Sequence, residues 1–427
     1  MDDAMASSGV RAEAEILIAG GGPAGSALAL RLARSGRDVL VLEASRFPRD
    51  KPCGDSVNPG AVSELRRLGV AEAVRERLHP TELAGWRVEA PDGARLEAGF
   101  DRRLGDVEGP RGWAVRRRDL DAVLLEVARL EGARVEHGVR VFDVLRSGRR
   151  VTGVRAHQGA AVREIRARLV VGADGLRSVV RRRLGLRSRR PGLRKLALVG
   201  HLPRVDGASG PGSLAPGCAR SPAFGELHVR EAFCVGFAPA AGGANVTLVV
   251  PAEEARRISA GPRDYVLGRL TSDRRLRDRF DPGAMEEGVM VTGPFDVPVR
   301  HATAPGALLV GDAAGYYDPF TGQGIYRALR SAALAGATVC RALRAPHRED
   351  ELFASYDRRL RHEFVVQRWV QRIIDGVVRR PTLMSWFVRR LGRGDGSAGR
   401  RLLRVTGDLD SPIGLLGFGF WGALMSP

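Results

Sequence analysis

The stretch from Gly311 to Leu329, GDAAGYYDPFTGQGIYRAL, gathers small and polar residues where a predicted strand gives way to a predicted helix. Glycines let a backbone approach a flat ring closely, and N–H groups at a helix N-terminus stabilise negative charge. A packed core does not require this composition, so the stretch indicates a ligand site. The residues that we expect to form it are Gly311, Asp312, Pro319, Gly322, Gln323 and Gly324.

A glycine motif near the N-terminus predicts a dinucleotide-binding turn. Gly20, Gly22 and Gly25 form GxGxxG between a predicted strand at 15–19 and a predicted helix. The three glycines allow, in order, a tight turn, approach of a pyrophosphate to the backbone, and close helix–strand packing. We expect the Glu43 carboxylate, at the end of the next strand, to accept hydrogen bonds from the adenosine ribose, with Pro23, Ala24 and Ala44 beside it. The motif alone does not separate NAD from FAD.

Two further strand ends carry an acidic residue. Asp174-Gly175 follows the predicted strand Leu169–Val171, and Gly311-Asp312 follows the predicted strand Ala307–Val310. With GxGxxG, these motifs make residues 13–345 similar to the group A flavin monooxygenase superfamily. That superfamily includes the para-hydroxybenzoate hydroxylase type and the geranylgeranyl reductases. The resemblance implies bound FAD, with NAD(P)H as electron donor.

The resemblance also implies roles for single residues. Asp312 would bind the ribityl chain of FAD, and Asp174 with Gly175 would lie near the cofactor and assist the nicotinamide donor. Arg117, or its neighbour Arg118, would contact FAD. The segment Lys51–Gly54 resembles a KPCG loop of the reductase branch, which places Cys53 and Gly54 near the isoalloxazine ring.

No acid–base pair stands out in the sequence. His201 and His228 lie on predicted strands and are candidate general bases, and Cys53 is a candidate catalytic thiolate. The four cysteines are scattered without a CxxC pair, so we expect no metal site and no disulfide framework.

The predicted fold class is α/β, with a Rossmann-like FAD-binding domain interleaved with a smaller mixed β-sheet substrate domain. We assign 13–80, 105–185 and 286–345 to the FAD-binding domain, and 81–104 and 186–285 to the substrate domain. Residues 346–427 read as a C-terminal helical region with an apolar tail. The tail's apolar run, Ile413 to Met425, is shorter than the ~20 residues a membrane-spanning helix needs. It either folds onto the protein body or forms a lipid-facing or pocket-covering flap, and peripheral membrane contact stays open.

The formal net charge of +19 does not by itself indicate nucleic-acid binding. Only two of the 68 basic residues are lysines, Lys51 and Lys195, and such a skew is what an arginine-rich genome produces. A basic cluster from Arg177 to Lys195 is either a solvated face or a site for an anionic partner. No secretory signal is visible, and we expect a cytoplasmic protein.

Our first hypothesis is an NAD(P)H-using monooxygenase that hydroxylates a hydrophobic aromatic or polyketide-like substrate through a flavin C4a-hydroperoxide. That substrate is either free or linked to a carrier protein or CoA. The alternative is a flavin-dependent reductase of C=C bonds in an isoprenoid or lipid. A third hypothesis is a basic carrier-protein or nucleic-acid binding module that retains the fold. Halogenases of this superfamily carry Trp-x-Trp-x-Ile-Pro and a catalytic lysine, and this chain lacks both features in the expected region.

Overall fold

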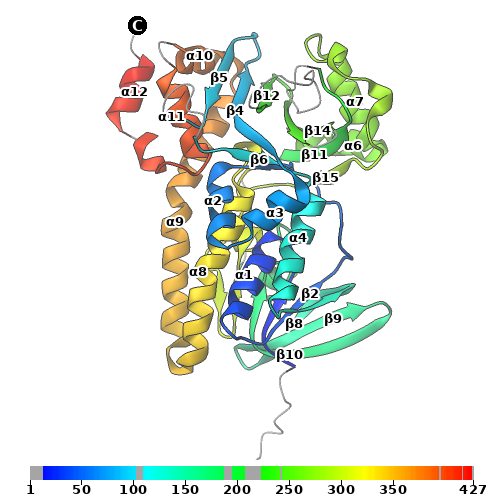
Figure 1. The fold of residues 1–427 in the computed structure, drawn as a ribbon, viewed down its shortest axis with the longest axis vertical. Helices are drawn as coiled ribbons and strands as arrows, with labels where there is room; N and C mark the ends of the chain where they lie inside the picture. Colours follow the sequence, from blue (N-terminus) through cyan, green and yellow to red (C-terminus); the bar gives the residue numbers. More distant parts are fainter. Residues whose placement is uncertain are drawn as a thin grey trace, which may run out of the picture.

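The computed structural model describes residues 13–101, 109–186, 195–206, 223–240, 243–393, 396–415 and 417–425. Two β-sheets organise this part of the chain, one below the other in the view of Figure 1. The lower sheet has the order β16-β17-β10-β1-β2-β7, and the upper sheet has the order β15-β11-β14-β13-β12-β4-β6-β3. The predicted α/β fold class with two interleaved sheets is confirmed.

The lower sheet holds the dinucleotide motif. From β17 to β7 its neighbouring strands run parallel, and the central strands are buried on both faces, as parallel strands covered by helices are. β8 and β9 extend β10 into an antiparallel hairpin layer. The strands are β1 (Ala14–Ala19), β2 (Val39–Glu43), β7 (Arg134–His137), β8 (Val139–Ser147), β9 (Arg150–Gln158), β10 (Ala161–Gly172), β16 (Thr303–Ala304) and β17 (Ala307–Leu309).

The register of the lower sheet brings three distant strand ends to one edge. Ala19 of β1 lies beside Gly172 of β10, and Gly172 lies beside Leu309 of β17. Because these strands are parallel, the turns that follow them all emerge at the same edge. The helices around this sheet are α1 (Pro23–Arg34), α2 (Pro59–Arg67), α3 (Ala71–Leu78), α4 (Arg117–Leu130), α5 (Val179–Arg183) and α8 (Gly324–Arg344).

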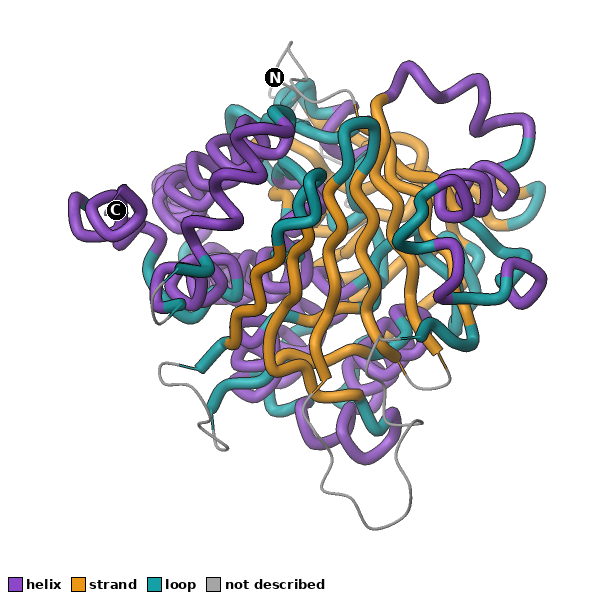
Figure 2. Tube along the Cα trace, turned by 90° about the horizontal axis from the view of Figure 1, so that it is seen from above, coloured by secondary structure: helices purple, strands orange, loops and turns teal. Residues whose placement is uncertain are grey.

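The upper sheet curves over that edge, and Figure 2 shows its strands side by side from above. Most of its pairs are antiparallel, with a parallel pair between β12 and β4. Its strands are β3 (Ser56–Val57), β4 (Thr81–Glu89), β5 (Arg95–Gly99), β6 (Gly112–Ala114), β11 (Lys195–Leu202), β12 (Ala223–Val229), β13 (Cys234–Ala240), β14 (Gly243–Pro251) and β15 (Met290–Thr292). The helices α6 (Ala255–Ala260) and α7 (Pro262–Ser272) pack on its outer side.

The C-terminal region is helical, as predicted. Its elements are α9 (Glu349–Val378), α10 (Pro381–Leu391), α11 (Ser397–Thr406), the 3-10 turn η7 (Pro412–Leu415) and α12 (Phe418–Met425). Figure 1 shows α9 running along one side of the molecule from the lower sheet to the upper one.

The predicted domain boundaries stay an interpretation. Three short strands, however, belong to a different sheet from the one that these boundaries imply. β3, β6 and β15 pair within the upper sheet, although they fall inside the ranges assigned to the FAD-binding domain. These strands are only two or three residues long, so their sheet is decided by pairing partners far away in the sequence. The chain therefore crosses between the sheets at short edge strands rather than at distinct linkers.

Candidate functional site

The GxGxxG turn is packed too tightly for side chains at two of its glycines. Gly20 has φ +107°, and a Cβ there would lie 2.5 Å from the Ala173 carbonyl oxygen. A Cβ on Gly25 would lie 1.9 Å from the Gly20 carbonyl oxygen. These distances are shorter than any real Cβ contact, so β1, β10 and α1 meet at this turn only because both residues lack a side chain.

Gly22 is different, because the space beside it is open and positively charged. A Cβ on Gly22 would meet only Lys51 Nζ at 3.8 Å and Arg49 Nη2 at 3.9 Å. Gly22 is also the N-cap of α1, and no side chain caps that helix. A helix N-terminus with two nearby cations fits an anionic pyrophosphate, so this turn suits the phosphates of a dinucleotide.

Glu43 closes the β2 end of the same turn. Its Oε2 accepts a hydrogen bond from the Gly21 N–H at 2.8 Å, and its Oε1 accepts one from the Ser45 N–H at 2.9 Å. Arg49 Nε lies 3.5 Å from Oε1. The carboxylate therefore shapes the loop around Ala44, and its contact with a ribose stays a prediction.

The two other acid-bearing strand ends are joined by an arginine that the sequence analysis did not single out. Arg181 of α5 donates to the Asp312 and Ala313 carbonyl oxygens at 3.2 and 3.1 Å, and to Leu176 O at 2.6 Å. Asp174 Oδ2 accepts the Val179 N–H at 2.6 Å, while its Oδ1 is buried without a hydrogen-bond partner in the structure. An acceptor left unsatisfied beside the turn is consistent with a missing donor from a ligand.

Of the two neighbouring arginines that are candidates for contact with FAD, Arg117 points inward and lines the cavity. Its guanidinium donates to Asp121 Oδ1 at 2.8 Å, and its backbone N–H donates to Asp55 Oδ1 at 3.0 Å. Burial alone would lower the pKa of Arg117, but the charges of Asp121 and the other neighbours raise it, so the side chain is a fixed cation. Arg118 points outward and lies 3.5 Å from Asp50.

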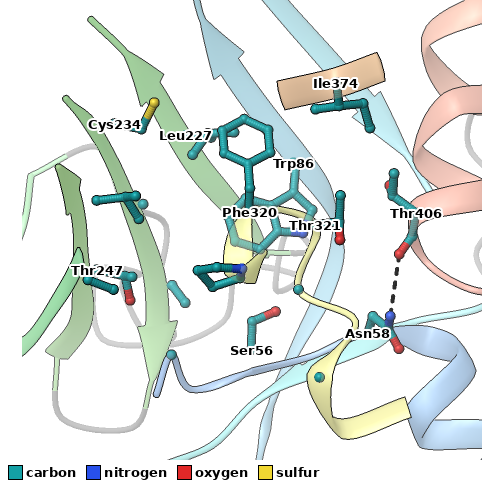
Figure 3. Close-up of a pocket in the computed structure, with 18 of the residues that line it drawn as sticks. Ser56, Asn58, Trp86, Leu227, Cys234, Thr247, Phe320, Thr321, Ile374 and Thr406 are labelled. Carbon is teal, nitrogen blue, oxygen red and sulfur yellow. Dashed lines mark hydrogen bonds between the residues drawn. The ribbon is translucent and has the colours of Figure 1, made fainter. Parts of the chain in front are cut away.

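A cavity of about 330 Å³ connects the motifs predicted to bind the flavin ring with the C-terminal helices. At one end it is lined by Gly54, Arg117, Gly175, Asp312, Pro319, Gly322 and Gly324. At the other end its wall is apolar and comes from β4, β5, α10 and α11, through Val88, Leu96, Ala98, Met384, Phe387, Leu391 and Leu402. Figure 3 shows Trp86, Leu227, Phe320 and Ile374 gathered around its middle. An apolar molecule can therefore reach the predicted ring site.

The polar wall of the cavity centres on Asp55, directly after the KPCG loop. Asp55 Oδ2 lies 2.8 Å from His201 Nε2, and on its far side His201 Nδ1 lies 3.9 Å from the half-exposed Glu286. Asn245 and Thr247 line the cavity next to Gly54 and hydrogen-bond to each other at 3.0 Å. His201 also lies on the same face of β11 as the cavity-lining residues Ala197 and Val199, because side chains alternate along a strand.

The structure places His228 away from the cavity. Its neighbour Leu227 lines the cavity, so His228 points to the opposite face of β12. There His228 Nε2 lies 2.9 Å from Glu226 Oε2, within a cluster that includes Glu89 and Arg279. Burial would lower the pKa of His228, but hydrogen bonds to both carboxylates outweigh it and raise the pKa. The residue is a member of a buried ion-pair cluster, not a base facing the substrate.

Two cysteines line the cavity with different environments. Cys53, the candidate thiolate, is partly exposed in the loop beside Gly54. Cys234 is buried, and burial raises the pKa of its thiol to about 12, so it stays protonated. Tyr316 also lines the cavity, and burial raises the pKa of its hydroxyl. The residues described include no cluster of His, Cys, Asp and Glu that could hold a metal ion.

Asp408 is a central polar residue that sequence reasoning missed. Its carboxylate accepts hydrogen bonds from Asn58 at 2.8 Å, from Gln323 at 2.6 Å and from Gln367. It thereby joins the end of α11 to the N-termini of α2 and α8 and to α9. Enclosure by protein raises the pKa of Asp408 to about 8, although the hydrogen bonds from Asn58 and Gln323 oppose this shift.

The residues present fit FAD. The uncapped α1 N-terminus with Arg49 and Lys51 suits its phosphates, and Asp312 and the glycines before α8 line the cavity at the ring end. The N-terminus of α8 is likewise not capped by a side chain, so its dipole is available to an anionic ring.

Comparisons with known proteins agree with this geometry. A family described as "FAD binding domain" matches residues 13–372. The menaquinone reductase of Mycolicibacterium smegmatis is 33% identical over 396 residues, which cover 89% of this chain and 91% of that protein. The digeranylgeranylglycerophospholipid reductase of Methanothrix thermoacetophila is 27% identical over 385 residues and 88% of each chain.

Among solved structures, a triple mutant of the flavin-dependent brominase Bmp2 superposes with a TM-score of 0.77. It is 19% identical to this chain, and the superposition covers 96% of this chain and 98% of that one. At this identity the likeness concerns the fold alone.

Proposed function

The chain belongs to the FAD-binding-domain family and is an FAD-dependent oxidoreductase, and we propose that it reduces carbon–carbon double bonds in the prenyl chain of an isoprenoid lipid. The observation that carries the proposal is the cavity, which continues from the ring-binding motifs into an apolar channel between β5, α10 and α11. A long hydrocarbon needs such a channel, whereas a compact aromatic substrate does not.

We place reduction ahead of hydroxylation for a second reason. The similar proteins that cover most of this chain include a menaquinone reductase and a digeranylgeranylglycerophospholipid reductase. The KPCG loop also resembles that branch, and its Gly54 lines the cavity. Trp86 of β4 also lines the cavity.

Reduction of a double bond adds a hydride to one carbon and a proton to the other. FAD, when bound and reduced by a donor such as NAD(P)H, would supply the hydride. We assign the proton to the Asp55–His201 pair. Asp55 lies in the cavity wall, and His201 connects it to the half-exposed Glu286, from which the pair regains its proton.

Other residues of the chain would orient the reactants. Arg117 and the uncapped α8 N-terminus place positive potential at the ring end. The apolar wall excludes water from the prenyl chain. Lys195 takes no part in the reaction, because it is held between Asp318 and Asp375.

The function is tested with the FAD-loaded protein, an NAD(P)H donor and a menaquinone or geranylgeranyl lipid dispersed in detergent. Under anaerobic conditions we expect each reduced bond to add one H₂ to the mass of the product, while the donor oxidises in equal amount. In air with labelled O₂ we expect no label in the product. Incorporation of label, or turnover that requires oxygen, would instead establish the monooxygenase.

A further inference from the structure

Large apolar side chains are exposed mainly at one end of the chain. Of the seven in the described residues, five belong to the C-terminal elements: Val365, Trp369 and Ile373 on α9, Ile413 on η7, and Trp421 on α12. Trp369 is 57% exposed and Ile413 is 64% exposed. Surface apolar residues scattered singly need no explanation, but a cluster on neighbouring elements does.

The three apolar residues of α9 form a stripe. Val365, Trp369 and Ile373 are spaced four apart, so they follow one side of the helix. The exposed Arg361 and Arg372 fall on the same side by helical periodicity. Arg372 also lies over the Trp369 ring, with its guanidinium carbon 5.7 Å from the ring centre. We call these five residues the α9 face.

The α9 face carries no acidic side chain. From Phe364 to Arg404 the sequence has ten arginines and two acids. One of the acids, Asp375, is buried and paired with Lys195 and Arg379. The surface therefore combines exposed tryptophan and aliphatic groups with positive charge, which is the composition of helices that lie on a membrane.

The face lies next to the cavity and to the tail. Ile374, Val377 and Val378, on the inner side of the same turns of α9, line the cavity. Helix α9 also packs against η7, which carries Ile413, and Figure 1 shows α9 and α12 along the same edge of the molecule.

We propose that the α9 face, with Ile413 and Trp421, docks on the surface of an anionic lipid bilayer. Aromatic and aliphatic groups would enter the headgroup region, and the arginines would pair with lipid phosphates. This inference rests on the proposed function, since docking would place the α10–α11 end of the cavity near a membrane-borne prenyl lipid. A second copy of the chain is a poorer occupant, because a two-fold contact would set the arginines of one copy against those of the other.

The test measures co-sedimentation of the full-length, FAD-loaded protein with substrate-free vesicles of phosphatidylcholine, alone or mixed with phosphatidylglycerol. We expect binding to the phosphatidylglycerol vesicles, little binding to phosphatidylcholine alone, and release by added salt. Replacing Trp369 and Ile373 by Ser should lower binding roughly tenfold or more, and Arg361→Gln with Arg372→Gln should do the same.

Matched controls are available elsewhere on the surface. Leu130 and Val162 are 62% and 58% exposed but lie far from α9 in the chain, so replacing both by Ser should leave vesicle binding unchanged. Arg204→Gln with Arg257→Gln is the corresponding charge control, since both arginines are exposed. Unchanged melting temperatures would show that each variant is folded.

The inference is overturned if wild-type protein stays in the supernatant with phosphatidylglycerol vesicles, or if the control variants lose as much binding as the α9 variants. It is also overturned if wild-type protein is a dimer that Trp369→Ser dissociates. Turnover of detergent-dispersed lipid separates this inference from the proposed function. Turnover without vesicle binding removes only the docking surface, and vesicle binding without turnover removes only the reductase.

Discussion

Two glycines of the same motif have different neighbours, so their alanine variants should fail in different ways. A methyl group on Gly25 would overlap the Gly20 carbonyl, whereas one on Gly22 would enter open space near Arg49 and Lys51. We expect Gly25→Ala to destabilise the protein by about 2 kcal/mol or more. Gly22→Ala should fold normally and bind FAD about tenfold more weakly, because the methyl group occupies the place of a phosphate.

The measurements are thermal unfolding without added FAD and titration of the apoprotein with FAD. The control substitution is Gly268→Ala, because Gly268 lies in a helix and no atom lies within 4 Å of the position that a Cβ would take. Gly36 is unsuitable as a control, because its φ of +70° would strain an alanine. If Gly22→Ala bound FAD like wild type, the phosphate assignment would be wrong.

His201 offers a second test at the level of single residues. If the Asp55–His201 pair delivers the proton, His201→Gln should lower turnover about 100-fold. It should also change the dependence of turnover on pH, because a glutamine side chain cannot pass on a proton. FAD binding should be unaffected, as His201 does not line the cavity.

His301→Gln is the matched control, because His301 is exposed and lies only near Asp357. A merely structural role for His201 would lower stability and leave the shape of the pH profile unchanged. That outcome would remove the pair from the proposed reaction.

At the scale of elements, the N-terminal end of α8 depends on a carboxyl group from α11. The pKa of Asp408 is raised from 3.8 to about 8, so the folded protein binds this proton more tightly than the unfolded chain does. Between these two pH values the folded state therefore loses stability as pH rises, and the loss is complete above about pH 8. We therefore expect the free energy of unfolding to fall as the pH rises towards about 8 and this proton is lost.

The measurement compares denaturant unfolding of wild type and Asp408→Asn between pH 5 and about pH 9. The variant loses the titrating proton, so the wild-type curve should fall relative to the variant curve as pH rises. A constant offset from altered hydrogen bonds does not affect this comparison. Parallel curves would show that Asp408 has an ordinary pKa in the folded protein.

The length of the channel can be tested on β5. Ala98 lines the cavity, while Glu97 on the same strand points outward. Ala98→Trp should fill the channel and lower turnover of long prenyl chains about tenfold or more, with short chains much less affected. Glu97→Trp should leave the turnover of both long and short prenyl chains unchanged. Equal losses for short and long chains would place the substrate elsewhere in the cavity.

Local patterns were sufficient to predict the strands and turns that meet at the sheet edge, which we propose hold FAD. Gly20 directly follows the buried strand β1, and Asp312 lies three positions after the end of β17, so their place at the sheet edge follows from neighbouring residues. The Asp55–His201 contact could not be predicted in the same way, because 146 positions separate the two residues. The same holds for Asp408 and for the channel wall from α10 and α11. No local signal marks a polar residue or an apolar helix face whose partner is set by the tertiary fold.

At the scale of the whole molecule, the core is divided between the two sheets and the C-terminal helices. The largest cluster of buried apolar residues surrounds the lower sheet, and a separate cluster joins β5 and β12 to α10 and α12. Leu415, Phe420 and Leu424 of the tail are buried in the second cluster, while Ile413 and Trp421 remain exposed. Part of the tail thus folds onto the body, and part of it faces outward. In the described residues no helix combines the length and hydropathy needed to cross a bilayer.

Because the turns that we propose bind FAD come from three distant parts of the chain, bound FAD should stabilise the molecule as a whole. A ligand at about 100 times its Kd adds roughly 2.7 kcal/mol to the free energy of unfolding. For a chain of 427 residues this corresponds to a rise in Tm of about 3 °C. Differential scanning calorimetry of the apoprotein with increasing FAD measures the shift, and Gly22→Ala should require about tenfold more FAD to reach it. FMN lacks the adenosine that the β1–α1 turn and Glu43 are predicted to hold, so it should shift Tm less at equal concentration. A Tm that is independent of FAD would mean that the three turns do not share one cofactor.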